Sequence, residues 1–221
     1  MYQKIFLIGG TGNVGTQLVE QIYQFGDIDR SRHKTPFQIV GISSSQEYLY
    51  NPEGLTQDKV EKFSKKKIKG EKFKSLLDFL TITNTQIPQG VIFTDTTAGK
   101  EDMRDFHLAT MEYSNSKIVT ANKNPISLYD MEVYRRLTSQ IGRYGFRCSV
   151  MAGAETLKFV QQSRIVNNPP ITINGCFSGT LGYIPYLLFE EGLTIQEATQ
   201  KAYEKKYTEP HPRDDLNWLD L

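Results

Sequence analysis

The feature that most constrains this 221-residue sequence is a glycine-rich segment close to its N-terminus. Residues 5–8 form a short apolar run typical of a buried strand, and apolar residues recur at helical spacing from Val14 to Phe25. Between them, residues 10–15 read Gly-Thr-Gly-Asn-Val-Gly and match the pattern G-x-G-x-x-G. A strand, a glycine turn and a helix in this order predict the first unit of a doubly wound α/β sheet.

Each glycine of this turn has a physical role in binding a dinucleotide. Gly10 permits the tight turn, Gly12 lets the backbone approach a pyrophosphate, and Gly15 lets the helix pack closely on the strand. The start of the helix, at Asn13 and Val14, offers free N–H groups and a positive dipole end to the phosphates. A glycine-rich turn without a ligand is the alternative, but the flanking strand and helix favour a dinucleotide site.

Composition narrows the classes of function. Lys and Arg number 26 against 25 Asp and Glu, so no overall field favours nucleic acid or an anionic membrane surface. No apolar run reaches the length of a transmembrane helix, and the first strand leaves no room for a signal peptide. Cys148 and Cys176 are expected to be small core residues. We therefore expect a cytoplasmic protein that acts on a small molecule, without a nucleic-acid or membrane partner.

The second strand, expected over residues 37–42, bears on the choice between NADP and NAD. In an NAD-binding fold an acidic residue at its end binds the ribose 2′-hydroxyl. Here Ser43 follows the strand, and the first acid is Glu47. NADP is therefore the expected cofactor, and NAD remains possible.

Two basic segments are interpreted as solvent-exposed surface and not as ligand-binding sites. Arg30, Arg32 and Lys34 precede the second strand and are expected at the sheet edge opposite the cofactor. Residues 46–75 hold seven lysines between positions 62 and 74 with aromatic residues among them, a pattern that could contact nucleic acid. Acidic residues dilute this charge, so a polar surface insertion is the favoured interpretation.

Two later strands also end in polar residues. Residues 90–99 predict a strand that leads into a loop with Thr97, and residues 116–123 predict one that ends at Lys123. Ligands of open α/β sheets bind at the carboxyl ends of strands, so both side chains are expected in the cofactor crevice. An ordinary surface lysine is the alternative for Lys123. A helix with a buried apolar stripe is expected over residues 127–141.

Four further motifs are Thr120-Ala-Asn-Lys-Asn124, Val150-Met-Ala-Gly153, Gly175-Cys-Phe-Ser-Gly-Thr-Leu-Gly-Tyr-Ile184 and Tyr207-Thr-Glu-Pro-His-Pro-Arg-Asp-Asp-Leu216. They occur in the order and spacing of homoserine dehydrogenases, which the sequence resembles over essentially its whole length. The resemblance implies a Rossmann-type doubly wound parallel sheet over residues 1–145 and an incomplete second α+β domain, for substrate and dimerisation, over residues 146–221. It also implies NAD(P)-dependent interconversion of L-aspartate 4-semialdehyde and L-homoserine, towards threonine and methionine, in a homodimer when full length.

The resemblance assigns roles to individual residues. The implied cofactor-binding residues are Gly10, Gly12, Asn13, Val14, Gly15, Thr97 and Lys123, and Ser43 joins them from its place at the end of the second strand. The implied substrate-binding residues are Thr180, Glu209, Asp214 and Asp220. The implied catalytic residues are Lys123, Glu209, Asp214 and Asp220.

The second half supports this interpretation on its own residues. It predicts a strand over residues 170–177, a helix that starts at the turn Gly179-Thr180, and a capping box from Thr194 to Glu197. Pro210 and Pro212 then hold an extended acidic loop. That loop is interpreted either as a rigid ligand clamp or as the entry to a helix capped by Asp214 or Asp215.

Four departures from the family pattern stand out, one of which is Asn217-Trp218 in place of the usual Ser-Gly after Asp-Asp-Leu. Lys206 replaces a glycine that lies two residues before the Thr of Thr-Glu-Pro, and Arg147 replaces an acid associated with a monovalent ion, so no metal is expected. The lysine that shuttles the hydroxyl proton in the family lies one helical turn after the acid matching Asp220, whereas the sequence ends at Leu221. Impaired catalysis is therefore expected.

Two other functions remain open. One is a non-catalytic NAD(P)-binding regulatory module. The other is a short-chain dehydrogenase-like reductase, whose Tyr-x-x-x-Lys pattern is matched by Tyr113 to Lys117. That pattern must lie on a helix, and the Ser-Asn-Ser within it is typical of a loop.

Overall fold

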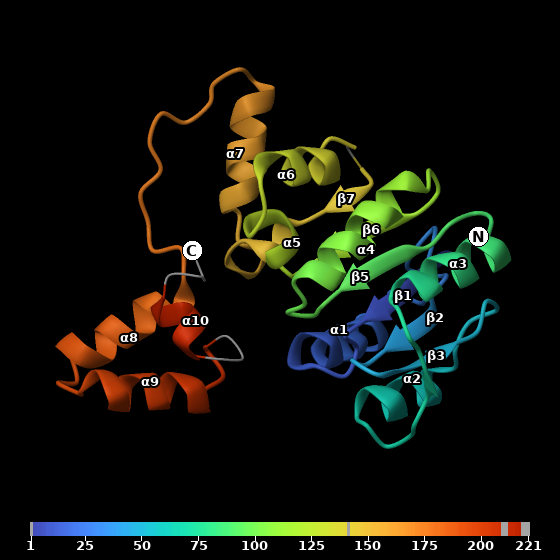
Figure 1. Cartoon of the computed structure of the whole chain (residues 1–221), viewed down its shortest axis with the longest axis horizontal. Helices are drawn as coiled ribbons and strands as arrows, with labels where there is room; N and C mark the ends of the chain where they lie inside the picture. Colours follow the sequence, from blue (N-terminus) through green and yellow to red (C-terminus); the bar gives the residue numbers. More distant parts are fainter. Residues whose placement is uncertain (1, 141, 209–211, 218–221) are drawn as a thin grey trace. The chain divides into compact units, whose positions relative to one another are not determined.

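The computed structural model describes residues 2–140, 142–208 and 212–217, without the side chain of Asp214 (Figure 1). The chain divides into two compact units, Met1–Ser149 and Val150–Leu221. Among the described residues, no helix combines the length and the apolar character that crossing a bilayer requires.

The first unit is built on a seven-stranded sheet with the order β4-β3-β2-β1-β5-β6-β7 (Figure 1). Its parallel strands are β1 (Gln3–Ile8), β2 (Phe37–Ser43), β5 (Ile92–Asp95), β6 (Lys117–Thr120) and β7 (Tyr144–Gly145). The antiparallel strands are β3 (Glu47–Tyr50) and β4 (Glu71–Lys72). From β1 the chain first builds one side of the sheet and then the other, so the topological switch point lies between β1 and β5. The predicted doubly wound sheet is confirmed.

Helices cover both faces of this sheet. Successive residues of β1 point to opposite faces and therefore pack against different helices. Ile5 and Leu7 pack into the core that Val19 of α1 shares. Phe6 stacks on Phe79 of α3 with 4.6 Å between ring centroids. Burial on both faces makes β1 a rigid base for the turn that follows it. The helical elements of this unit are α1 (Asn13–Gln24), α2 (Gln57–Ser64), α3 (Leu77–Gln86), α4 (Glu101–Glu112), α5 (Asn124–Ser127), α6 (Met131–Thr138) and the short 3₁₀ helix η1 (Arg147–Ser149).

The expectation of a surface insertion over residues 46–75 is wrong. This stretch supplies β3, α2 and β4, and Val60 and Phe63 of α2 are buried in the core beside α1. Helix α2 has a short buried face, and lysines surround it in the sequence. The charge pattern alone therefore indicated a loop.

The helix expected over residues 127–141 is divided into α5 and α6. Asp130 begins α6 as its N-cap and accepts a hydrogen bond from the backbone N of Val133 at 3.0 Å. The break moves Leu128 and Met131 to the surface, whereas Leu137 stays fully buried. A capping residue inside an apolar stripe therefore outweighed the helical spacing.

The second unit consists of helices in its described part. They are the 3₁₀ helix η2 (Met151–Gly153), α7 (Thr156–Ile165), α8 (Gly179–Phe189), α9 (Ile195–Glu204) and α10 (Pro212–Leu216). Helices α8 and α9 pack through Leu187 and Ala198, both fully buried. The predicted capping box of Thr194 and Glu197 opens α9 and is confirmed.

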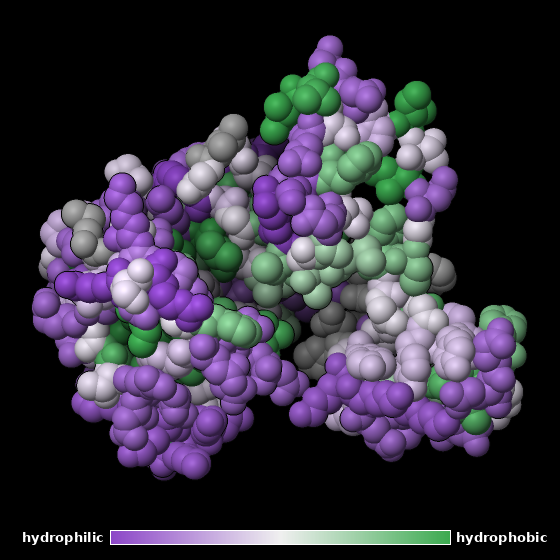
Figure 2. All heavy atoms as spheres, turned by 180° about the vertical axis from the view of Figure 1, so that it is seen from behind, coloured by the Kyte–Doolittle hydropathy of each residue, from purple (hydrophilic) through white to green (hydrophobic). Residues whose placement is uncertain are grey.

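Two expectations for apolar residues are wrong. Residues 170–177 form no strand, and Ile171 is fully exposed. An extended segment becomes a strand only when another backbone pairs with it, and no strand lies beside it in the described part of this unit. Apolar side chains consequently reach the surface of the unit (Figure 2). Cys148 and Cys176 are exposed free thiols and not core residues.

Candidate functional site

The turn between β1 and α1 contains glycines that internal packing alone requires. Gly9 has a φ of +80°, a left-handed backbone that other residues rarely adopt. A Cβ atom at Gly10 would lie 2.4 Å from Cγ1 of Ile42, and one at Gly15 would lie 2.3 Å from the carbonyl oxygen of Gly9. The predicted close packing of helix on strand at Gly15 is therefore present.

Gly12 has no such internal constraint. Its backbone is extended, with φ −81° and ψ 175°, and a Cβ atom there would meet only the Gly9 carbonyl at an ordinary 3.4 Å. Gly12, Asn13 and Val14 are all exposed. Within residues 12–16, no side chain caps α1 and no acid lies in its first turn. The open space and the first-turn N–H groups fit an anionic ligand.

The carboxyl end of β2 lies directly beside this turn. The backbone N of Gly10 donates to the carbonyl of Ser43 at 2.8 Å. Ser43 is fully buried, and its Oγ has no hydrogen-bond partner among the described residues. Ser64, the last residue of α2, donates from Oγ to the carbonyl of Gly10 at 2.8 Å. Helix α2 therefore ends against the glycine turn, and the exposed Lys65 and Lys66 follow it.

The carboxyl end of β5 contacts the same turn from the other side. Asp95 is buried, and its Oδ1 accepts hydrogen bonds from the backbone N and the Oγ1 of Thr97 at 2.8 Å and 2.7 Å. A Cβ atom at Gly9 would lie 2.8 Å from Cγ2 of Thr97. The backbone N of Thr96 also donates to the carbonyl of Ile8 at 3.0 Å. The turn that carries Thr97 thus packs on the glycine turn.

Two asparagines position Lys123 after β6. The Nδ2 of Asn122 donates to the carbonyl of Gly99 at 2.9 Å, and the Nδ2 of Asn124 donates to the carbonyl of Ala98 at 3.0 Å. Lys123 lies half-buried between them at the start of α5. Its backbone is therefore fixed beside the turn that holds Thr97.

A buried polar chain that was not predicted lies behind Asp95. His107 of α4 is fully buried, and its Nε2 lies 3.2 Å from Oδ2 of Asp95, although the ring is poorly aligned for a hydrogen bond. Its Nδ1 lies 2.8 Å from the hydroxyl of Tyr144 in β7. Burial raises the pKa of the Tyr144 phenol, and the Asp95 carboxylate raises it further. The sequence signal was a histidine four residues from both Met103 and Met111, on the buried face of α4.

The second unit ties Thr180 to the segment that leads into its acidic loop. Thr180 is buried near the start of α8, and its Oγ1 donates to the carbonyl of Tyr207. Lys206 has a φ of +58°, and the backbone N of Tyr207 donates to the carbonyl of Ala202 at 3.0 Å. This is a Schellman ending of α9 with a lysine at the position that favours glycine.

The acidic residues themselves fall largely outside the described residues. This holds for Glu209, Asp220 and the side chain of Asp214. Helix α10 begins at Pro212, so residues 212–216 are helical and not part of an extended loop, and neither Asp214 nor Asp215 is the N-cap of α10. Both expectations are wrong for this segment. Asp215 is buried.

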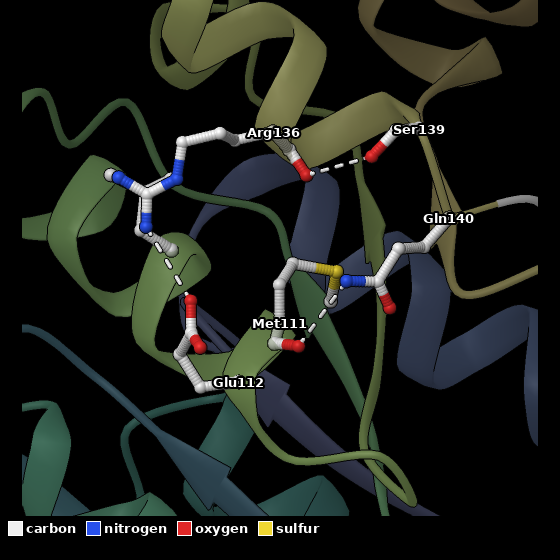
Figure 3. A pocket seen from close by; sticks show the side chains of 6 residues that line it. Met111, Glu112, Arg136, Ser139 and Gln140 are labelled. Carbon is white, nitrogen blue, oxygen red and sulfur yellow. Dashed lines mark hydrogen bonds and ion pairs between the residues drawn. The ribbon is translucent and has the colours of Figure 1, made fainter.

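Two further features lie outside the candidate site. Tyr113 ends α4 and Lys117 begins β6, so they share no helix, and the short-chain dehydrogenase pattern is a chance match. A pocket of about 180 Å³ lies between α4 and α6, where Arg136 pairs with Glu112 at 3.4 Å (Figure 3). The last turn of α4 lies toward the amino ends of the strands, away from the glycine turn.

Comparison with known proteins points to one family. The family model described as homoserine dehydrogenase matches residues 157–221. The homoserine dehydrogenase of Schizosaccharomyces pombe is 29% identical over 97% of this chain and 58% of its own length. The bifunctional aspartokinase/homoserine dehydrogenase of Haemophilus influenzae is 26% identical over 98% of this chain and 26% of its own length.

Solved structures agree on the fold. The homoserine dehydrogenase of Thermoplasma acidophilum has a TM-score of 0.72 at 22% identity and covers all of this chain and 66% of its own. A putative homoserine dehydrogenase of Archaeoglobus fulgidus has a TM-score of 0.74 at 17% identity, over 99% and 64%.

The chain is similar to homoserine dehydrogenases over nearly its whole length, and it spans 58% and 26% of the two curated relatives.

The structure brings together part of the site that the resemblance predicts. Five residues of the glycine turn lie at one sheet edge with three residues of the neighbouring strand ends: Gly10, Gly12, Asn13, Val14, Gly15, Ser43, Thr97 and Lys123. Thr180 belongs to the second unit. Among the described residues, no group of three or more His, Cys, Asp or Glu side chains could hold a metal ion.

Proposed function

We propose that this chain binds NADP, or NAD, at the carboxyl edge of its sheet and acts in the interconversion of L-aspartate 4-semialdehyde and L-homoserine. The observation that carries the proposal is Gly12, which the fold does not require but which keeps open the space in front of the first turn of α1. The orphaned Oγ of Ser43 also fits a polar ligand at this edge. When bound, the nicotinamide group supplies or accepts the hydride.

The proposed roles follow the positions of the residues. Gly10, Gly12, Asn13, Val14 and Gly15 would hold the pyrophosphate through backbone N–H groups. Thr97 and Lys123 would face the nicotinamide side, where Lys123 orients substrate and cofactor. In the second unit, Thr180, Glu209, Asp214 and Asp220 would form the amino-acid site, with the acids binding the substrate ammonium.

The end of α2 supports NADP as the cofactor. β2 ends at the neutral Ser43, which offers no carboxylate to a ribose 2′-hydroxyl. The hydrogen bond from Ser64 to Gly10 brings the turn with Lys65, Lys66 and Lys67 to the same edge. A 2′-phosphate would meet positive charge there, whereas NAD would gain less from it.

Replacement of these lysines tests the preference. Changing Lys65, Lys66 and Lys67 to Gln should weaken NADPH binding about tenfold and leave NADH binding within about twofold, measured by fluorescence titration. Lys62→Gln is the matched control, because Lys62 lies one turn earlier and pairs with Asp58 at 2.9 Å. Equal losses for both nucleotides would contradict the assignment.

Coupling to homoserine tests the function as a whole. NADPH should bind this chain, and homoserine should change its affinity, since two ligands of one site are linked thermodynamically. An NADPH affinity that does not change when homoserine is added would favour the regulatory module. NADPH oxidation with L-aspartate 4-semialdehyde then measures the activity of the chain. The homodimer and the cytoplasmic setting expected from the sequence remain part of this proposal.

A further inference from the structure

We propose that His107 is a positioning residue for the nicotinamide half of the bound nucleotide, acting through Asp95 and Thr97. The inference rests on the proposed function, because it requires that a nucleotide binds at the glycine turn. His107 itself is fully buried in α4 and does not reach the surface of the site.

A continuous chain of contacts leads from β7 to the glycine turn. The Tyr144 hydroxyl lies 2.8 Å from Nδ1 of His107, and Nε2 of the same ring lies 3.2 Å from Oδ2 of Asp95. Oδ1 of Asp95 accepts from the backbone N and the hydroxyl of Thr97. The methyl group of Thr97 then packs on the backbone of Gly9. Each member is buried or half-buried, so a change at one end is not absorbed by solvent.

The donors and acceptors of this chain favour one arrangement. A neutral imidazole has one N–H donor and one bare nitrogen acceptor. An N–H on Nε2 would face Oδ2 of Asp95 across 3.2 Å as an electrostatic contact without hydrogen-bond alignment, and Tyr144 would then donate to the bare Nδ1. Thr120 adds a contact at 3.4 Å between its Oγ1 and Oδ2 of Asp95. In this arrangement His107 fixes the carboxylate plane, and the carboxylate fixes the Thr97 turn.

The chain acts on one side of the glycine turn only. Asp95 and Thr97 follow β5, whereas Ser43 follows β2, on the other side of β1. In a doubly wound sheet the two halves of a dinucleotide lie on opposite sides of the switch point. Loss of the contact between His107 and Asp95 should therefore affect the nicotinamide half and spare the adenosine half.

Two matched variants test this inference in the 221-residue chain. His107→Gln places an amide nitrogen near the position of Nε2 and keeps a donor to Asp95, whereas His107→Asn places its amide near Nδ1 and loses that donor. The probes are NADPH and 2′-phospho-ADP-ribose, which differ by the nicotinamide ring. His107→Asn should weaken NADPH binding about tenfold and leave 2′-phospho-ADP-ribose within about twofold. His107→Gln should stay close to the unchanged chain for both.

Tyr144→Phe keeps the ring and removes only the hydroxyl, so it gives the same test if His107→Asn does not fold. It should weaken NADPH about threefold and leave 2′-phospho-ADP-ribose unchanged. An equal loss of affinity for both probes would show a merely structural role and overturn the inference. Variants that bind both probes as tightly as the unchanged chain would also overturn it. An unchanged chain that binds neither probe would overturn the proposed function, and this inference with it.

Discussion

The glycine turn allows the internal needs of the fold to be separated from the needs of a ligand. We consider two single substitutions three residues apart, Gly12→Ser and Gly15→Ala. At Gly12 a Cβ atom has ordinary contact distance to its one neighbour, and the backbone is extended. At Gly15 a Cβ atom would lie 2.3 Å from one backbone oxygen and 2.7 Å from the Cα of Gly10.

The expected magnitudes follow from these distances. Gly12→Ser places a good N-cap on a helix that has none, so the free energy of unfolding should stay the same or rise by up to about 1 kcal/mol. The same hydroxyl fills the space in front of the first-turn N–H groups. Loss of about two charge-assisted hydrogen bonds, at roughly 1.5 kcal/mol each, weakens nucleotide binding by more than about a hundredfold. Gly15→Ala should instead cost about 2–3 kcal/mol of stability, because backbone atoms cannot move aside.

Urea unfolding and NADPH titration of both variants form the assay. The two variants should change different quantities. Gly12→Ser should keep the free energy of unfolding and lose NADPH binding, whereas Gly15→Ala should lower the free energy of unfolding. If Gly12→Ser binds NADPH as tightly as the unchanged chain, no pyrophosphate approaches this backbone, and the argument for a dinucleotide site fails.

Three further outcomes are expected. Lys206→Gly should stabilise the second unit by about 1 kcal/mol in urea unfolding, since lysine at a φ of +58° is strained, whereas Lys205→Gly in the preceding turn should destabilise it. Burial, with a smaller effect of Glu61, raises the pKa of Tyr23 from 10.0 to about 12, so stability is constant below pH 10 and falls between pH 10 and 12. Tyr23→Phe should remove a loss of roughly 1–2 kcal/mol from that alkaline titration. Ser64→Ala should cost about 1–2 kcal/mol in thermal unfolding, because it strands the Gly10 carbonyl.

The sequence predicted those parts of the structure that depend on neighbours along the chain. The glycine turn, the carboxyl ends of β2, β5 and β6, and the capping box at Thr194 all have local signals, and the structure has the strands and helices where these signals place them. The lysine-rich stretch before residue 75 was misjudged because charge hides a short buried helix face, here Val60 and Phe63. The strand over residues 170–177 failed because pairing depends on a second backbone that local pattern cannot report.

The candidate site was predicted in its residues but not in what holds them. Its members were predicted because each follows the carboxyl end of a strand, and the topology of the sheet brings these ends together. Their support comes from His107, Tyr144 and Ser64, which lie on other elements and contact the site only after the chain has folded. The role of the acids near Glu209 stays a prediction, since the structure does not describe that residue.

The state of the polar groups at this edge indicates where binding energy for a nucleotide would come from. Thr97 already bonds to Asp95, and Asn122 and Asn124 bond to the carbonyls of Gly99 and Ala98, so a ligand would not have to order these turns. At the glycine turn and the end of β2, the groups still open to a partner include the first-turn N–H groups of α1 and the buried Oγ of Ser43. A preorganised edge loses little conformational entropy on binding, so satisfying these few groups is what remains for the ligand to contribute. Affinity should therefore depend on the residues beside Gly12 and Ser43 more steeply than on any loop of this unit.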